Sequence, residues 1–124
     1  MPISYTKEMQ GDYILVHAQG TTQDTDDLIR YIDRFVADCV DCGTNRILLD
    51  HRDLMFDRKF AGTYDVAVRC TKRMSLDHPY RVALIARPER MEFARVYETI
   101  GLNRGVEIKA FERPKLAKVW LKSG

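Results

Sequence analysis

Residues 46–62, RILLDHRDLMFDRKFAG, indicate the topology of this 124-residue chain. The run RILLD (46–50) is almost continuously apolar, as expected of a strand that helices cover on both faces. We expect the strand to end at Asp50, a charged loop to follow, and a helix to begin with Asp57 as its cap. A loop after the carboxyl end of a parallel strand is where an α/β protein usually keeps its site. The stretch therefore predicts a parallel sheet and the place of a functional site.

Strands and helices alternate on either side of this stretch. Residues 3–9 and 13–20 alternate polar and apolar side chains around Gly11-Asp12, which predicts a β-hairpin whose second, more apolar strand is the more central. Residues 24–43 predict an amphipathic helix that ends at Gly43. The elements predicted downstream are a strand around 82–86, a helix from Pro88 to Gly101 that buries Phe93, Tyr97 and Ile100, an edge strand at 106–111, and a helix from Pro114 that buries Leu116, Ala117, Trp120 and Leu121. The order predicts one α/β domain over residues 1–124, with a mixed, mostly parallel sheet flanked by helices.

The composition excludes several classes of protein. The chain is 45% hydrophobic and 31% charged, which is typical of a globular domain, and its net charge of +2 is too small to indicate nucleic-acid binding. No run approaches the roughly 18 apolar residues of a membrane span, and MPISYTKEMQ lacks the pattern of a signal peptide. Because the three cysteines, Cys39, Cys42 and Cys70, are an odd number, we expect free thiols and a cytoplasmic protein.

Charge is unevenly distributed along the chain. Residues 24–41 contain six Asp and two Arg, a balance of −4, and residues 103–124 contain six Lys or Arg and two Glu, a balance of +4. Two interpretations remain open. The segments are solvated helix faces, or they are complementary patches for self-association or a charged partner.

Two motifs that could carry chemistry fit structural roles better. Cys39 and Cys42 form a C-x-x-C, but they close an acidic helix, whereas a redox site needs a helix N-terminus to lower the thiol pKa. His51 beside Asp50 and Asp53 could act as an acid–base group, but no Ser or Cys nucleophile is close in sequence. We therefore expect no enzyme activity, no metal and no cofactor.

The segment after Asp50 is the candidate interaction site. Arg52, Arg58 and Lys59 at a helix N-terminus could bind an anion such as phosphate or a carboxylate. Met55 and Phe56 are large apolar residues between charged ones, which indicates that they cover a ligand cleft or a partner. The candidate interaction or anion-binding loop comprises Asp50, His51, Arg52, Asp53, Phe56, Asp57, Arg58 and Lys59.

Four segments together resemble one known family over nearly the whole chain. They are YILVHAQG (13–20) leading into the acidic helix, RILLD with its polar loop, PYRVALIARPE (79–89), and VEIKAFERPKLAKVWL (106–121). They resemble the STAS domains, in particular the SpoIIAA-like group, of which the final Ala-x-x-Trp-Leu, from Ala117 to Leu121, is typical. The resemblance implies a four- or five-stranded mixed sheet flanked by helices.

The chain departs from this family at one residue. In the anti-sigma-factor antagonists, the resemblance implies a phosphorylatable serine at the start of the helix after the RILLD-like strand. The corresponding positions here, about Asp57 to Phe60, carry no hydroxyl group, and the nearest hydroxyls belong to Thr63 and Tyr64. A phosphorylation switch is therefore not expected.

The resemblance leaves two functions open. The first is a regulatory module that works through protein–protein contact, often as a homodimer, with the contact at residues 50–60. The second follows from the likeness of this fold to the lipid-binding CRAL-TRIO domains: a carrier of an apolar small molecule. Its pocket would lie between the second and third helices and the sheet, lined by Phe60, Tyr64, Phe93 and Tyr97.

Overall fold

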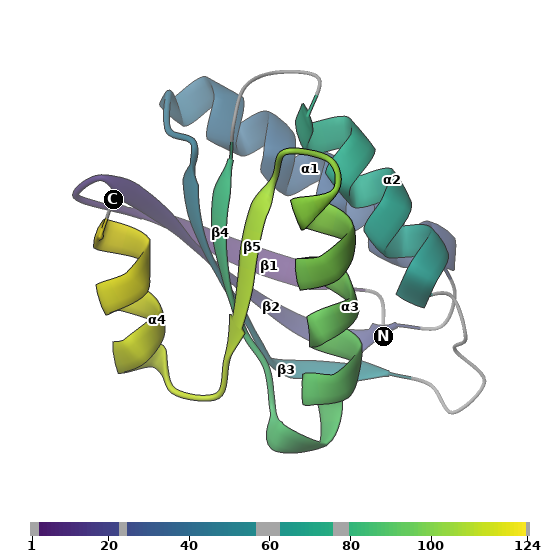
Figure 1. Ribbon diagram of the computed structural model, residues 1–124. Helices are drawn as coiled ribbons and strands as arrows, with labels where there is room; N and C mark the ends of the chain where they lie inside the picture. Colours follow the sequence, from purple (N-terminus) through teal and green to yellow (C-terminus); the bar gives the residue numbers. More distant parts are fainter. Residues whose placement is uncertain (1–2, 23–24, 57–62, 76–79, 124) are drawn as a thin grey trace.

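The computed structural model describes residues 3–22, 25–56, 63–75 and 80–123, which form one α/β unit (Figure 1). The elements along the chain are β1 (Ser4–Gln10), β2 (Tyr13–Thr22), α1 (Thr25–Cys42), β3 (Arg46–Phe56), α2 (Thr63–Ser75), β4 (Arg81–Ile85), the 3-10 turn η1 (Pro88–Arg90), α3 (Met91–Leu102), β5 (Glu107–Phe111) and α4 (Pro114–Lys122). The order of strands and helices is the one that the sequence predicts. The helix start predicted at Asp57 lies outside the described residues.

The described strands form one sheet in the order β1-β2-β3-β4-β5. β1 is antiparallel to β2, and the other neighbours are parallel. The hairpin turn contains Gly11, whose φ of 66° favours glycine. The mixed sheet, the position of β2 inside β1 and the edge position of β5 confirm the predictions.

The helices cover the two faces of the sheet unequally. Figure 1 shows α4 on one face and α1, α2 and α3 on the other. The larger core, which includes Phe35, Ile47 and Val82, lies under α1–α3. A smaller core, which includes Leu48 and Leu121, lies under α4. The central strands are thus buried on both faces, which explains why RILLD is almost wholly apolar.

The predicted end of β3 at Asp50 is wrong, because the strand continues to Phe56. Its last residues find their partners on the long strand β2, where Gln19 lies opposite Asp53 and Thr22 lies opposite Phe56. The register shifts between His17 and Gln19, so the strand passes an irregularity before pairing resumes. Pairing with β4 ends at Asp50, so the extension has a described strand on one side only.

The predicted role of Gly101 as a helix stop is also wrong. Helix α3 runs on to Leu102, and the positive φ of 77° belongs to Gly105 in the following turn. A Cβ on Gly101 would lie 2.6 Å from the Val106 carbonyl oxygen. Gly101 therefore allows α3 to approach the chain entering β5, which is a packing role.

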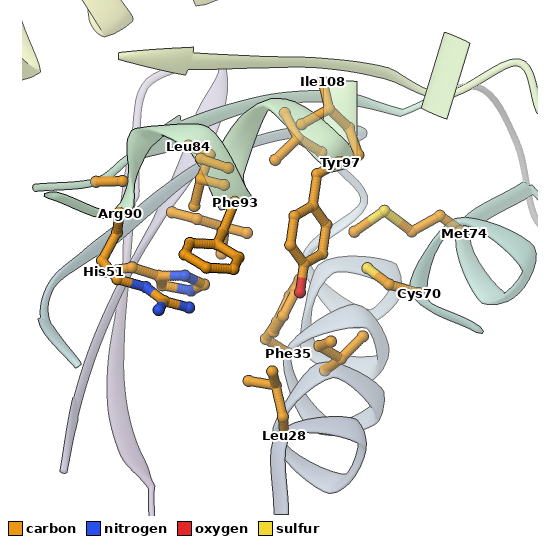
Figure 2. A pocket seen from close by; sticks show the side chains of 15 residues that line it. Leu28, Phe35, His51, Cys70, Met74, Leu84, Arg90, Phe93, Tyr97 and Ile108 are labelled. Carbon is orange, nitrogen blue, oxygen red and sulfur yellow. The ribbon is translucent and has the colours of Figure 1, made fainter. Parts of the chain in front are cut away.

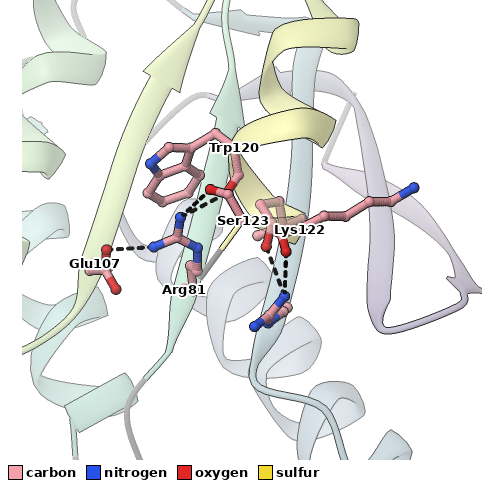
Figure 3. A network of polar contacts seen from close by, with 7 residues as sticks. Arg81, Glu107, Trp120, Lys122 and Ser123 are labelled. Atoms are coloured by element: carbon pink, nitrogen blue, oxygen red, sulfur yellow. Dashed lines mark hydrogen bonds and ion pairs between the residues drawn. The ribbon is translucent and has the colours of Figure 1, made fainter.

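Two arginines hold the C-terminal end of α4 against the sheet (Figure 3). Arg46 on β3 donates to the carbonyl oxygen of Leu121 at 3.1 Å, and Arg81 on β4 donates to that of Trp120 at 2.7 Å. Cationic donors satisfy helix-end carbonyl groups that have no partner within the helix. The helix buries Ala117 and Leu121, but Leu116 is 55% exposed, so its predicted burial is wrong. Leu116 follows Pro114 by two residues and lies outside the face that contacts the sheet.

Candidate functional site

A cavity of about 60 Å³ lies between the sheet and helices α1, α2 and α3 (Figure 2). Its walls are almost entirely apolar, because each of the three helices turns its apolar stripe toward the same face of the sheet. The lining includes Phe35 from α1, Cys70 from α2, His51 from β3, Arg90 from η1, and Phe93, Ala94 and Tyr97 from α3.

Phe93 and Tyr97, the two pocket residues predicted on α3, both line this cavity. The other two predicted pocket residues, Phe60 and the side chain of Tyr64, lie outside the described part of the structure. Arg90, which precedes α3 and completes this side of the cavity, is not among the predicted pocket residues.

Phe93 and Arg90 form the exposed part of the wall. Phe93 is 41% exposed, so the prediction that α3 buries it is wrong. The Arg90 guanidinium carbon lies 4.2 Å from the centroid of the Phe93 ring, which is a cation–π contact. Partial exposure leaves both side chains room to rearrange if a larger molecule enters.

His51 turns toward the helices and away from the carboxylates with which the sequence associates it. Its Nε2 lies 2.8 Å from the hydroxyl oxygen of Tyr31 on α1. Burial lowers the pKa of His51 from 6.5 to about 4, against the opposing effect of the Asp50 charge. Burial also raises the pKa of Tyr31 well above 10.0. The pair is therefore a neutral hydrogen bond at pH 7, and His51 is not poised for proton transfer near that pH.

The two carboxylates have other partners. Arg52 makes a bidentate contact with Asp50, with Nε–Oδ1 and Nη2–Oδ2 distances of 2.9 and 2.7 Å. Burial alone would raise the pKa of Asp50, but the hydrogen bonds from Arg52 lower it below its usual value. Asp53 lies 2.7 Å from His17 Nε2. Asp50 thus pairs with Arg52 inside the β3 extension, and Asp53 pairs with His17 on the neighbouring strand β2.

The remainder of the candidate loop is only partly described. Met55 is 51% exposed at the end of β3. Phe56 ends the strand, but its side chain is not described, and Asp57, Arg58 and Lys59 lie outside the described residues. Anion binding by Arg58 and Lys59 stays a prediction.

The His51 environment predicts how stability depends on pH. The pKa of about 4 in the folded protein lies below the 6.5 of the exposed side chain, so the unfolded chain binds more protons between these values. The free energy of unfolding should therefore fall as the pH drops from 6.5 to 4. Protonation of Asp50, whose pKa is lowered in the folded protein, reduces the free energy of unfolding further only below a pH of about 3.8. Urea unfolding at steps across this range measures the slope. His51→Gln should flatten it, and an unchanged slope in that variant would contradict the assignment to His51.

No described helix has the length and apolarity needed to cross a membrane. Nowhere in the described ranges do three or more His, Cys, Asp or Glu side chains gather as metal ligands would.

Comparison with solved structures identifies the fold. An uncharacterised protein of the DUF3478 family with a SpoIIAA-like fold, from Shewanella loihica PV-4, is 23% identical with a TM-score of 0.56, over 96% of this chain and 93% of that one. An anti-sigma factor antagonist from Mycobacterium paratuberculosis is 13% identical with a TM-score of 0.59, over 98% of this chain and 95% of that one. No family model and no curated protein matches the chain. The class is therefore an α/β domain with the SpoIIAA-like fold, as the resemblance in sequence predicts.

Proposed function

We propose that this chain is a non-enzymatic regulatory module with the SpoIIAA-like fold, and that its cavity binds a small apolar molecule. The cavity is the observation that carries the proposal, because its lining is almost entirely apolar and includes Phe93 and Tyr97. The absence of a hydroxyl residue from Asp57 to Phe60 argues against regulation by phosphorylation at that place.

The size of the cavity limits what enters without rearrangement. Its volume is about 60 Å³, whereas pockets for drug-sized ligands have roughly 300–1,000 Å³. A larger ligand would therefore have to displace Phe93 and Arg90, the exposed part of the wall. An apolar cavity that stays dry binds small apolar molecules without displacing ordered water.

Xenon is a suitable probe for a cavity of this size and polarity. In NMR spectra of the protein under xenon pressure, we expect shifts confined to residues around the cavity. Ala94→Leu, which adds atoms inside the cavity, should abolish them. Ala37→Leu makes the same change on an exposed position of α1 and should leave them intact. Wild-type spectra that do not respond to xenon would contradict the proposal.

Contact with a protein partner, including a second copy in a homodimer, is a second candidate. Met55 favours it, since an exposed apolar side chain lies on a strand extension that, among the described strands, pairs with β2 alone. A strand that ends a described sheet in this way is a surface to which a partner could add, through apolar contact and backbone hydrogen bonds.

The two charged segments do not favour a closed dimer by themselves. The acidic helix α1 and the basic helix α4 lie on opposite faces of the sheet (Figure 1). A contact between α1 of one copy and α4 of another would be head-to-tail, which tends to extend into open assemblies. A twofold dimer would have to use one surface against itself, and the end of β3 is the surface we propose.

Two exposed methionines allow a matched test of this surface. Met55 is 51% exposed on β3 and Met9 is 44% exposed on β1. We expect Met55→Lys to convert a dimer to monomer in native mass spectrometry, whereas Met9→Lys should leave the dimer unchanged. A dimer that survives in both variants would exclude the β3 surface.

A further inference from the structure

Helix α4 exposes cationic and apolar side chains next to one another. Its sequence contains three lysines and no acidic residue. Lys115, Lys118 and Lys122 are three and four residues apart, so they form one stripe along the helix, and all three are exposed. Leu116 and Val119 lie on the neighbouring stripe and are 55% and 63% exposed. We call these five residues the outer face of α4.

The contacts of α4 with the sheet keep this outer face toward solvent. Ala117 and Leu121, on the opposite side of the helix, are completely buried. Arg46 and Arg81 bind carbonyl oxygens at the end of the helix and hold it in place. Among the described helices, α4 alone covers its face of the sheet (Figure 1). A flat surface can therefore approach the outer face without meeting another described helix.

The positive charge of this region calls for an anionic partner. Residues 103–124 have a charge balance of +4. Helix α1 of a second copy is a weak complement, although it is rich in aspartate. Within the chain, Asp27 lies 2.5 Å from Arg30 and Asp38 lies 3.0 Å from Lys7, so these two carboxylates are already paired. The surface that α4 complements therefore belongs to another kind of partner.

The mixture of side chains on the outer face favours lipid over nucleic acid or an acidic protein. At a bilayer surface, side chains such as Leu116 and Val119 enter the boundary between headgroups and acyl chains. The phosphate backbone of a nucleic acid offers no such apolar layer. All the cations of α4 are lysines, whose long stems reach headgroups while their apolar neighbours are buried. Bidentate pairing with a protein carboxylate would instead favour arginine.

We propose that the outer face of α4 docks on the surface of a membrane rich in anionic lipid. The three lysines contact the headgroups, and the two aliphatic side chains enter the boundary with the acyl chains. The domain binds as a folded unit, because the buried side of α4 stays packed on the sheet. Binding is weak and reversible, on the order of the 10⁴ M⁻¹ that a single myristoyl chain provides.

Co-flotation of the whole protein with lipid vesicles tests this docking. We expect binding to vesicles of phosphatidylglycerol and phosphatidylcholine in equal parts, no binding to phosphatidylcholine alone, and loss of binding at high salt. Lys115→Gln combined with Lys118→Gln should weaken binding by about fivefold for each lysine. The matched control combines Arg30→Gln with Arg34→Gln, which removes the same charge from exposed positions of α1 on the other face of the sheet. It should keep the wild-type affinity.

The apolar part of the contact has its own variant. Val119→Ser should weaken vesicle binding by about fivefold, the scale of burying part of one aliphatic side chain. Val40→Ser, at a position of α1 that is 46% exposed, should not weaken it. Neither change should alter binding to polyglutamate, an acidic polymer without an apolar layer.

Three results would overturn the inference. Equal binding to both kinds of vesicle would exclude the role of anionic lipid. Equal losses in the lysine and arginine variants would assign the effect to net charge and not to α4. Vesicle binding that Val119→Ser leaves unchanged, or that polyglutamate matches in affinity, would replace the lipid with an acidic macromolecule. None of these results bears on the cavity, which the xenon experiment tests separately.

Discussion

Phe35→Ala should lower the free energy of unfolding by about 3–5 kcal/mol, the usual cost of removing a buried phenylalanine. Phe35 is completely buried, and its ring centroid lies 5.0 Å from that of Tyr31. Phe35 also lines the existing cavity. Removal of its ring therefore enlarges that cavity, and the cost in stability rises with cavity volume. Urea unfolding followed by circular dichroism measures the change.

Phe93→Ala is the matched control, because the same side chain is removed from the same cavity wall. Phe93 is 41% exposed and packs on Arg90. Its loss should cost less than about 1 kcal/mol, the scale of an exposed cation–π contact. Equal losses in the two variants would contradict the arrangement in which Phe35 anchors the wall and Phe93 forms its exposed part.

The sequence predicts the fold well where side-chain periodicity reports burial. Leu28, Ile32, Phe35 and Cys39, spaced as one helical stripe, are all buried on α1. The extension of β3 was missed for a physical reason. His51, Arg52 and Asp53 have the composition of a loop, but the length of β2 decides whether their backbone groups find partners. That pairing is a contact between distant parts of the chain, which local composition does not show.

Part of the cavity lining could be predicted from the sequence, because side-chain type and helical spacing are local signals. Phe93 and Tyr97 stood out as large aromatic residues on one helix, and both line the cavity. The hydrogen bond between His51 and Tyr31 was missed, since it joins residues 20 positions apart on different elements. Arg90 carried no local signal that separates it from other surface arginines. Its position follows from the way η1 turns the chain from β4 into α3.

Arg81→Met should have the second large effect, a loss of about 2–4 kcal/mol from hydrogen bonds to a charged group. Its side chain is 15% exposed, and its Nη1 lies 2.6 Å from Oε2 of Glu107 on β5. Its Nη2 donates to the Trp120 carbonyl oxygen, and its guanidinium carbon lies 3.8 Å from the centroid of the Trp120 ring (Figure 3). Methionine keeps the apolar stem and removes all of these contacts. Arg81→Lys should recover only part of the loss, because an ammonium group cannot reproduce the planar fork.

Because Trp120 is the one tryptophan of the chain, its fluorescence reports on α4 alone, whereas circular dichroism reports on the whole fold. In Arg81→Met, we expect the fluorescence transition in urea to precede the circular dichroism transition, as α4 detaches before the sheet unfolds. Glu107→Gln, which removes a partner that is 63% exposed, should cost less than about 1 kcal/mol and keep the transitions together. Should Glu107→Gln match Arg81→Met in size, the ion pair rather than the anchoring of the helix end would be the source of the stability.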